Sequence, residues 1–120
     1  MSKIKLILDK DNDFYGIEFL CPACKYVDGT PQRHTIRVNQ IPAGYKASSI
    51  PLLKLHAWDW NVNLEKPSIT PSVRRSFPRE NGKVYTCHSV ITDGYINFAN
   101  DSTHPLAGQT VELLDFNDNQ

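Results

Sequence analysis

The chain has 120 residues, 40% of them hydrophobic, which is enough for one modest core and therefore for one domain. Thirteen basic residues balance thirteen acidic ones, which excludes the overall charge that drives non-specific binding to nucleic acid or anionic membranes. The apolar run at the N-terminus meets Asp9 too early for a signal peptide or a bilayer span, so we expect a cytoplasmic protein.

Hydrophobic residues in the first third of the chain alternate with the period of β-strands. Strands are predicted at Ile4–Leu8 and Tyr15–Phe19, and the second of these runs directly into the segment Cys21–Cys24. A third strand follows the turn at residues 29–31 and carries His34 on its apolar face.

The middle of the chain contains less regular segments. Residues 50–56 fit a short helix at most, whereas the alternation through residues 58–65 predicts a half-buried strand with both tryptophans. Two prolines in Pro67–Ser72 exclude a helix or a central strand and favour a rigid extended segment. Residues 74–83 are polar and charged, which is typical of an exposed loop or hairpin tip.

The last third gives the clearest hairpin, Val84–Phe98, with Asp93-Gly94 at its turn. Thr110–Phe116 is a last strand. We predict a mainly β fold, a small antiparallel sheet or sandwich with a zinc-ribbon-like metal site. One zinc-binding domain is expected over residues 1–116, followed by a flexible tail at 117–120.

The cysteines indicate a metal site rather than a disulfide. They are three in number, and in a reducing compartment thiols stay free. A reducible thiol pair of the thioredoxin kind would need a βαβ context, which the pattern lacks. Two cysteines separated by two residues can bind one zinc ion at about 2.3 Å each. The predicted zinc ligands are Cys21, Cys24, His34 and Cys87, with His88 and His104 as alternates.

Cys87 and His88 are neighbours on a predicted strand, so their side chains point to opposite faces and do not bind the same ion. The sequence leaves open which face meets the Cys21–Cys24 pair. For His34, a hydrogen-bonded core position is the alternative to a ligand position.

A structural zinc ion has four protein ligands, whereas a catalytic one keeps a position for water. His88 and His104 are the candidates for a second, more open site and for catalysis. Other polar residues have simpler explanations. Turn geometry accounts for Asp93, a polar loop for Asp101, and turn or capping hydrogen bonds for the alternating hydroxyls that end at Ser72.

Two further groups have both a functional and a structural interpretation. Arg74, Arg75 and Arg79 form a basic cluster that fits a phosphate or an acidic partner, or simply a solvated loop. Trp58 and Trp60 alternate on one strand, a pattern more typical of core residues than of a binding platform.

Five motifs in order resemble a family of small phage and prophage proteins of unknown function. They are Cys21-Pro-Ala-Cys24, Trp58-Asp-Trp60-Asn61, Pro67-Ser-Ile-Thr-Pro71-Ser72, Cys87-His88-Ser89-Val-Ile-Thr-Asp93-Gly94 and Asp101-Ser-Thr-His104-Pro-Leu-Ala-Gly108. The resemblance implies a zinc-binding β-rich domain. Some members carry an ammonia monooxygenase label, which the lack of a membrane segment speaks against. Similar domains also occur beside bacterial ubiquitin-like conjugation genes.

Three functions follow as hypotheses. The first is a non-enzymatic, zinc-stabilised phage accessory protein that binds a host protein in the host cytoplasm, in the context of counter-defence. The second is a metal-dependent hydrolase that uses His88 and His104 near zinc. The third, a nucleic-acid-binding module, is disfavoured by the zero net charge.

Overall fold

The computed structural model describes residues 2–26, 28–49, 57–78 and 82–116. These residues form eight strands in one sheet, and each strand lies beside its neighbours in the sequence. The strands are β1 (Lys5–Leu8), β2 (Phe14–Lys25), β3 (Pro31–Val38), β4 (Ala57–Trp60), β5 (Ile69–Pro78), β6 (Val84–Thr92), β7 (Tyr95–Phe98) and β8 (Thr110–Glu112). The prediction of a mainly β fold is confirmed. The predicted tail at 117–120 and the possible helix at 50–56 lie outside the described residues.

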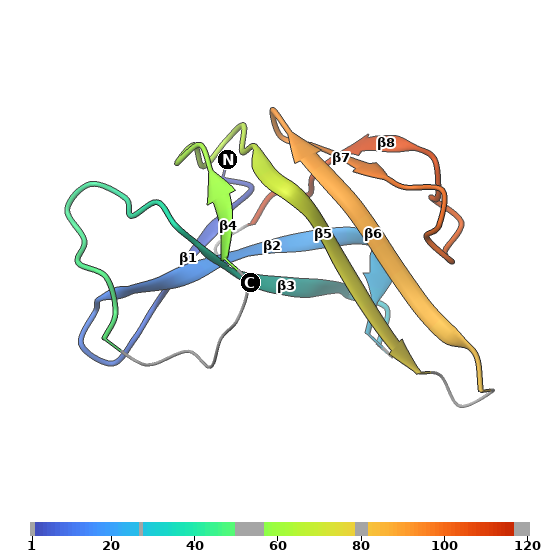
Figure 1. Ribbon diagram of the computed structural model, residues 1–120, viewed down its shortest axis with the longest axis horizontal. Coiled ribbons are helices and arrows are strands. Elements are labelled where there is room, and N and C mark those ends of the chain that lie inside the picture. The colour runs from blue at the N-terminus through green and yellow to red at the C-terminus, as the bar shows by residue number, and fades with distance from the viewer. Residues whose placement is uncertain (1, 27, 50–56, 79–81, 117–120) are drawn as a thin grey trace.

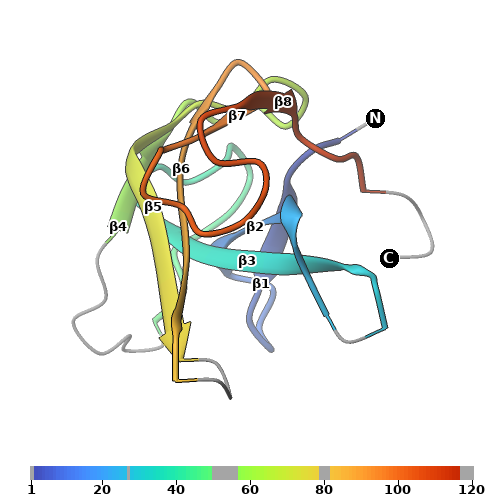
Figure 2. The same cartoon turned by 90° about the vertical axis from the view of Figure 1, so that its right-hand side faces the viewer.

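The sheet is mixed but mostly antiparallel, because only β3 and β4 pair in the parallel direction. It curls into a half-barrel in which β1–β3 and β5–β8 form two halves joined by β4 (Figures 1 and 2). Fully buried side chains from both halves meet in one core, among them Phe19 from β2, Ile91 from β6 and Phe98 from β7. Burying each of these side chains contributes about 1.5–3 kcal/mol to folding.

The hairpin of β6 and β7 forms as the sequence predicts. Its turn residues have positive φ angles, 50° at Asp93 and 83° at Gly94. Right-handed strand twist favours such a turn, and glycine and aspartate adopt this backbone region more readily than most residues. The turn fixes the register in which Ile91 lies opposite Ile96.

The strand predicted over residues 58–65 is too long. β4 ends at Trp60, and Val62 has a φ of 58°, outside the strand region. The Asn63 side-chain oxygen accepts hydrogen bonds from the backbone of Glu65 and Lys66. These local bonds stabilise a turn in place of a longer strand.

The prediction for residues 67–83 is also wrong in part, because β5 is a central strand between β4 and β6. The register shifts between Ile69 and Val73, which removes Pro71 from the regular ladder. Beyond this irregularity Arg74–Pro78 pair with β6, so the charged residues lie on a paired strand rather than in a loop.

No helix within the described ranges has the length and hydrophobicity needed to cross a bilayer.

Candidate active site and metal centre

Strand β6 separates two groups of chemically active side chains. Cys87 is buried, with 1% of its surface exposed, and the next residue, His88, is half-buried. Adjacent residues of a strand point to opposite faces, as the sequence predicts for this pair. Cys87 therefore points into the core, and His88 points toward the outer surface.

On the inner side, Cys21 and Cys24 at the end of β2 meet His34 from β3. Their ligand atoms all lie within 4.8 Å of one another, and all three side chains are buried. The pairing of β2 with β3 accounts for this, because Cys21 lies opposite Gln32, two residues from His34. These three residues could hold a metal ion.

Cys87 reaches the same cluster from the other half of the sheet, since its Sγ lies 3.8 Å from the Sγ of Cys21. The cysteines are all free thiols. Hydrogen bonds from Cys21 and Cys87 lower the pKa of Cys24, and the Tyr85 hydroxyl also donates to Cys24 Sγ at 3.2 Å. Hydrogen bonding to Cys24 raises the pKa of Cys21 to about 11, and hydrogen bonding to Cys21 and Cys24 raises the pKa of Cys87. The pKa values thus favour the thiolate form at Cys24 only, and a metal ion bound here would bring Cys21 and Cys87 to that form as well.

His34 is held in place by packing rather than by hydrogen bonds. Its ring lies 5.1 Å from the ring of Phe19, and neither ring nitrogen has a hydrogen-bond partner among the described residues. A buried imidazole with no partner is costly, so this arrangement fits a metal ligand better than a core histidine.

His104, the other buried histidine, is separate from that three-residue group. Its Nδ1 accepts a hydrogen bond from the backbone of Leu106, and its ring packs edge-on against Phe98 at 4.6 Å. Burial lowers the pKa of His104. His104 thus packs the loop that follows β7, but its Nε2 is buried without a hydrogen-bond partner among the described residues, so it stays an alternate ligand.

On the outer side, His88 lies between a serine and an aspartate. Its Nε2 is 2.8 Å from Ser72 Oγ, and its Nδ1 is 2.9 and 3.1 Å from the two carboxylate oxygens of Asp101. A carboxylate only accepts hydrogen bonds, so in the neutral imidazole Nδ1 carries the hydrogen and Nε2 accepts from the Ser72 hydroxyl. A serine nucleophile, its base and an orienting acid form a hydrogen-bond chain of the same order in serine hydrolases.

The sheet and the loop after β7 bring these three residues together. In the β5–β6 pairing Arg74 lies opposite His88. Ser72 lies two residues before Arg74 on β5, so it is a diagonal neighbour of His88 across the two strands. The loop that carries Asp101 is bound to β6, because Ala99 N donates to His88 O and Thr103 N donates to Thr86 O. Ser102 Oγ accepts from His88 N at 3.0 Å and donates to His88 O at 3.1 Å.

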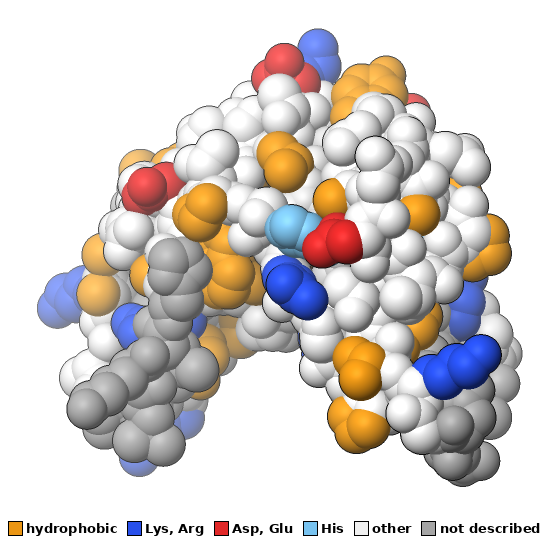
Figure 3. Space-filling model, turned by 45° about the vertical axis from the view of Figure 1, so that its right-hand side comes forward, with side chains coloured by type: hydrophobic (Ala, Val, Ile, Leu, Met, Phe, Trp, Pro, Cys, Tyr) orange, Lys and Arg blue, Asp and Glu red, His pale blue; other side chains and the backbone are white. Residues whose placement is uncertain are grey.

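Figure 3 shows this side of the molecule, with a histidine side chain at the surface beside an acidic and a basic side chain. The histidine lies at the rim of a hollow, where a large substrate could approach.

The sequence model of the bacterial ubiquitination-like system serine protease family (BubE) matches residues 1–99. The chain belongs to this family. The matched range includes Ser72 and His88 and ends just before Asp101. No curated protein and no solved structure matches the chain.

Membership of the BubE family corrects the predicted identity and function. The assignment to phage proteins of unknown function is wrong, because the matching family is one of bacterial serine proteases. A non-enzymatic host-binding protein, a zinc-dependent hydrolase and a nucleic-acid-binding module are wrong for the same reason. The physical reason is that the cysteines and His34 form one site inside the sheet, whereas the Ser72 hydroxyl and His88 belong to another site on its outer side.

Sequence reasoning named His88 as a catalytic candidate but missed both of its partners. It explained Ser72 by turn and capping hydrogen bonds and Asp101 by its polar loop, whereas both side chains contact His88. A usable signal was present. A hairpin turn near Gly82 implies that residue numbers of paired positions on β5 and β6 add to about 162, which places Ser72 within two positions of His88.

Proposed function

We propose that the protein is a serine protease in which Ser72 is the nucleophile, His88 the general base and Asp101 the residue that orients His88. The observation that carries the proposal is the continuous chain of hydrogen bonds from Ser72 Oγ through the His88 ring to Asp101. Membership of a serine protease family supports it independently. The order of triad residues along the chain differs between unrelated folds, so geometry is the criterion.

The mechanism follows from the donors and acceptors. When Ser72 Oγ attacks the carbonyl carbon of an amide bond, His88 Nε2 takes the hydroxyl proton and later gives it to the leaving amine. Asp101 keeps the Nδ1 hydrogen in place and stabilises the imidazolium ion that forms. Water then hydrolyses the ester on Ser72, with His88 acting as base again. The family name sets the biological context of this cleavage in a bacterial ubiquitination-like system.

Zinc bound by Cys21, Cys24, His34 and Cys87 is the second part of the proposal. Zinc–sulfur bonds of about 2.3 Å in a tetrahedron place two sulfurs about 3.8 Å apart. The Cys21–Cys87 separation of 3.8 Å fits this edge. Four protein ligands leave no position for water, so zinc here stabilises the fold and supplies no step of the reaction. The Cys87 ligand would tie β6, and with it His88, to the β2–β3 half of the sheet.

The experiment that tests the nucleophile is reaction with a fluorophosphonate probe, which modifies activated serines. We expect one adduct per chain at Ser72, located by peptide mapping, and no adduct in Ser72→Ala. The matched control is Ser76→Ala, which removes a hydroxyl from the same strand where it contacts Thr86 rather than His88. Labelling that persists in Ser72→Ala, or is absent from the folded wild-type protein, would contradict the proposal.

A further inference from the structure

A pocket of about 360 Å³ opens between β3 and β5. It exists because β4 is short. β4 pairs with β3 only at Arg37 and Val38 and with β5 only at Ile69 and Thr70. Along the rest of β3 and β5, no described strand fills the space between the two. The volume suits the side chain of a bound peptide together with part of its backbone.

The pocket adjoins the nucleophile. Val73, which follows Ser72 in the chain, forms part of its wall. Trp58 forms another part and donates a hydrogen bond from its ring nitrogen to the carbonyl oxygen of Ser72 at 3.1 Å. The pocket therefore borders the backbone of Ser72, and a substrate side chain in it would lie beside the strand that carries the nucleophile.

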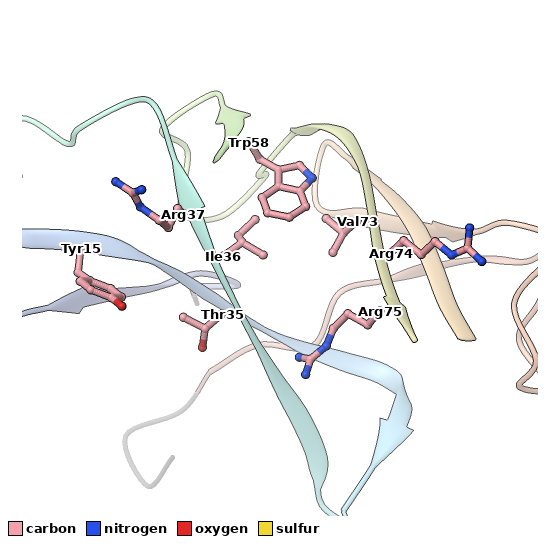
Figure 4. Close-up of a pocket in the computed structure, with 8 residues that line it drawn as sticks. All are labelled: Tyr15, Thr35, Ile36, Arg37, Trp58, Val73, Arg74 and Arg75. Atoms are coloured by element: carbon pink, nitrogen blue, oxygen red, sulfur yellow. The ribbon is translucent and has the colours of Figure 1, made fainter. Parts of the chain in front are cut away.

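The walls are apolar. Ile36, Trp58 and Val73 surround the same space in Figure 4, and Ile36 and Val73 belong to the buried core. An apolar group that enters releases the water in contact with these surfaces. The favourable free energy is about 25 cal/mol for each Å² of apolar surface that becomes buried. The pocket thus favours an aliphatic or aromatic side chain over a polar one.

The rim is basic. Arg37, Arg74 and Arg75 line the pocket, and no acidic side chain does so among the residues that the structure describes. None of the three arginines forms an ion pair with the part of the chain that the structure describes, and Arg37 Nε is buried there without a hydrogen-bond partner. Figure 4 shows Arg75 extending toward Thr35, whereas Arg37 and Arg74 extend away from the space between Ile36, Trp58 and Val73. Guanidinium groups in such positions suit a carboxylate.

We propose that this pocket is the specificity pocket for the protein substrate. It takes an apolar side chain close to the scissile bond, while Arg75 binds an acidic residue near that side chain in the substrate. The inference rests on the proposed serine protease function and adds the chemistry of the substrate to it.

The test is to map cleavage sites in a library of unmodified peptides by mass spectrometry. For the wild-type protein we expect sites with an aliphatic or aromatic residue close to the cleaved bond and an acidic residue within about three positions. Arg75→Glu should reduce cleavage of the acidic peptides about tenfold relative to their basic counterparts, since opposite charges become like charges. Lys10→Glu, the same charge change at an exposed position outside the pocket, should leave the preference unchanged.

A second variant tests the apolar part. Thr35 is exposed and lines the pocket, so Thr35→Trp should fill the space and shift cleavage toward peptides with small residues. Fluorophosphonate labelling of Ser72 is measured on each variant, because the small probe reacts without occupying the pocket. Absent labelling would refute the proposed function. Normal labelling with the same cleavage-site preference in wild-type, Arg75→Glu and Thr35→Trp would overturn the specificity pocket alone.

Discussion

The two faces of β6 at residues 87 and 88 place opposite demands on their surroundings. Cys87 faces a buried cluster of thiols and an imidazole that could hold a metal ion away from water. His88 faces a half-exposed chain of hydrogen bonds, where its partner Asp101 keeps 50% of its side-chain surface in contact with solvent. One site requires burial, and the other requires access for substrate.

The comparison explains how one small sheet can hold both sites. Because side chains alternate along a strand, consecutive residues can serve opposite faces without any loop between them. A shift of the β6 register by one residue would exchange the two faces and destroy both sites. Cys87 and His88 therefore depend on the same pairing with β5, although their chemistry is independent.

Loss of the inner site should have the largest effect. Cys24→Ser removes a thiolate from the cluster, and apparent zinc-binding energies of about 10–16 kcal/mol exceed the stability of most small domains. We expect a chain without zinc that is unfolded at 25 °C by circular dichroism and has no protease activity. Ala23→Ser, between the two cysteines at the end of β2, is the control and should stay folded with one zinc per chain. If Cys24→Ser were as stable as the wild-type protein, the fold would not depend on the cluster.

Asp101→Asn should affect only the outer site. An amide in place of the carboxylate no longer holds the Nδ1 hydrogen of His88, so kcat/KM should fall by about 10⁴-fold. Because the Asp101 side chain is half exposed, we expect the thermal midpoint and the zinc content to stay unchanged. Asp93→Asn is the control, because Asp93 lies in an exposed turn whose positive φ asparagine also adopts. A decrease of less than tenfold in Asp101→Asn would contradict the orienting role.

Ser102→Ala should weaken the outer site more mildly. The buried Ser102 hydroxyl binds the backbone of His88 through both its oxygen and its hydrogen. Its loss removes the acceptor of the His88 N–H, whereas His88 O keeps the hydrogen bond from Ala99 N, and the free energy of unfolding should fall by about 1–3 kcal/mol. We expect kcat to fall about tenfold while KM changes little, because the base is misplaced but the pocket is intact. An unchanged kcat in steady-state assays would show that the backbone of His88 needs no such support.

Tyr85→Phe is the counterpart on the inner site and should have the smallest effect. It removes the hydroxyl that donates to Cys24 Sγ but keeps the aromatic ring in place. Loss of a hydrogen bond to a ligand commonly reduces metal affinity about 10–100-fold. With saturating zinc, kcat/KM should therefore equal the wild-type value, whereas competition with a chelator should extract zinc more readily. A lower kcat/KM with saturating zinc would show that the two faces are coupled.

The sequence predicted the inner site better than the outer one, for a physical reason. Cys21 and Cys24 lie two residues apart, and the alternation around His34 places that side chain on the buried face, so local pattern was enough. The outer site depends on three residues from β5, β6 and a loop. Ser72, His88 and Asp101 each have an ordinary local explanation until the pairing of β5 with β6 is known.

The fold shows the same division. Alternation and turn residues predicted the hairpin of β6 and β7 correctly, because both signals are local. The prolines near Ser72 led to a wrong prediction, since a break in the ladder between Ile69 and Val73 lets a central strand include Pro71. The parallel pairing of β3 with β4 connects segments on either side of residues 39–56, and no local pattern encodes such a contact.

Native mass spectrometry of the wild-type protein after fluorophosphonate treatment tests the central claim most directly, because one spectrum reports on both faces of β6. We predict a folded chain that carries one zinc ion and one phosphonate adduct at the same time, with the adduct mapped to Ser72. A folded chain with zinc that remains unlabelled, or an adduct that forms on a cysteine with loss of zinc, would contradict the separation of a structural metal centre from a serine protease site.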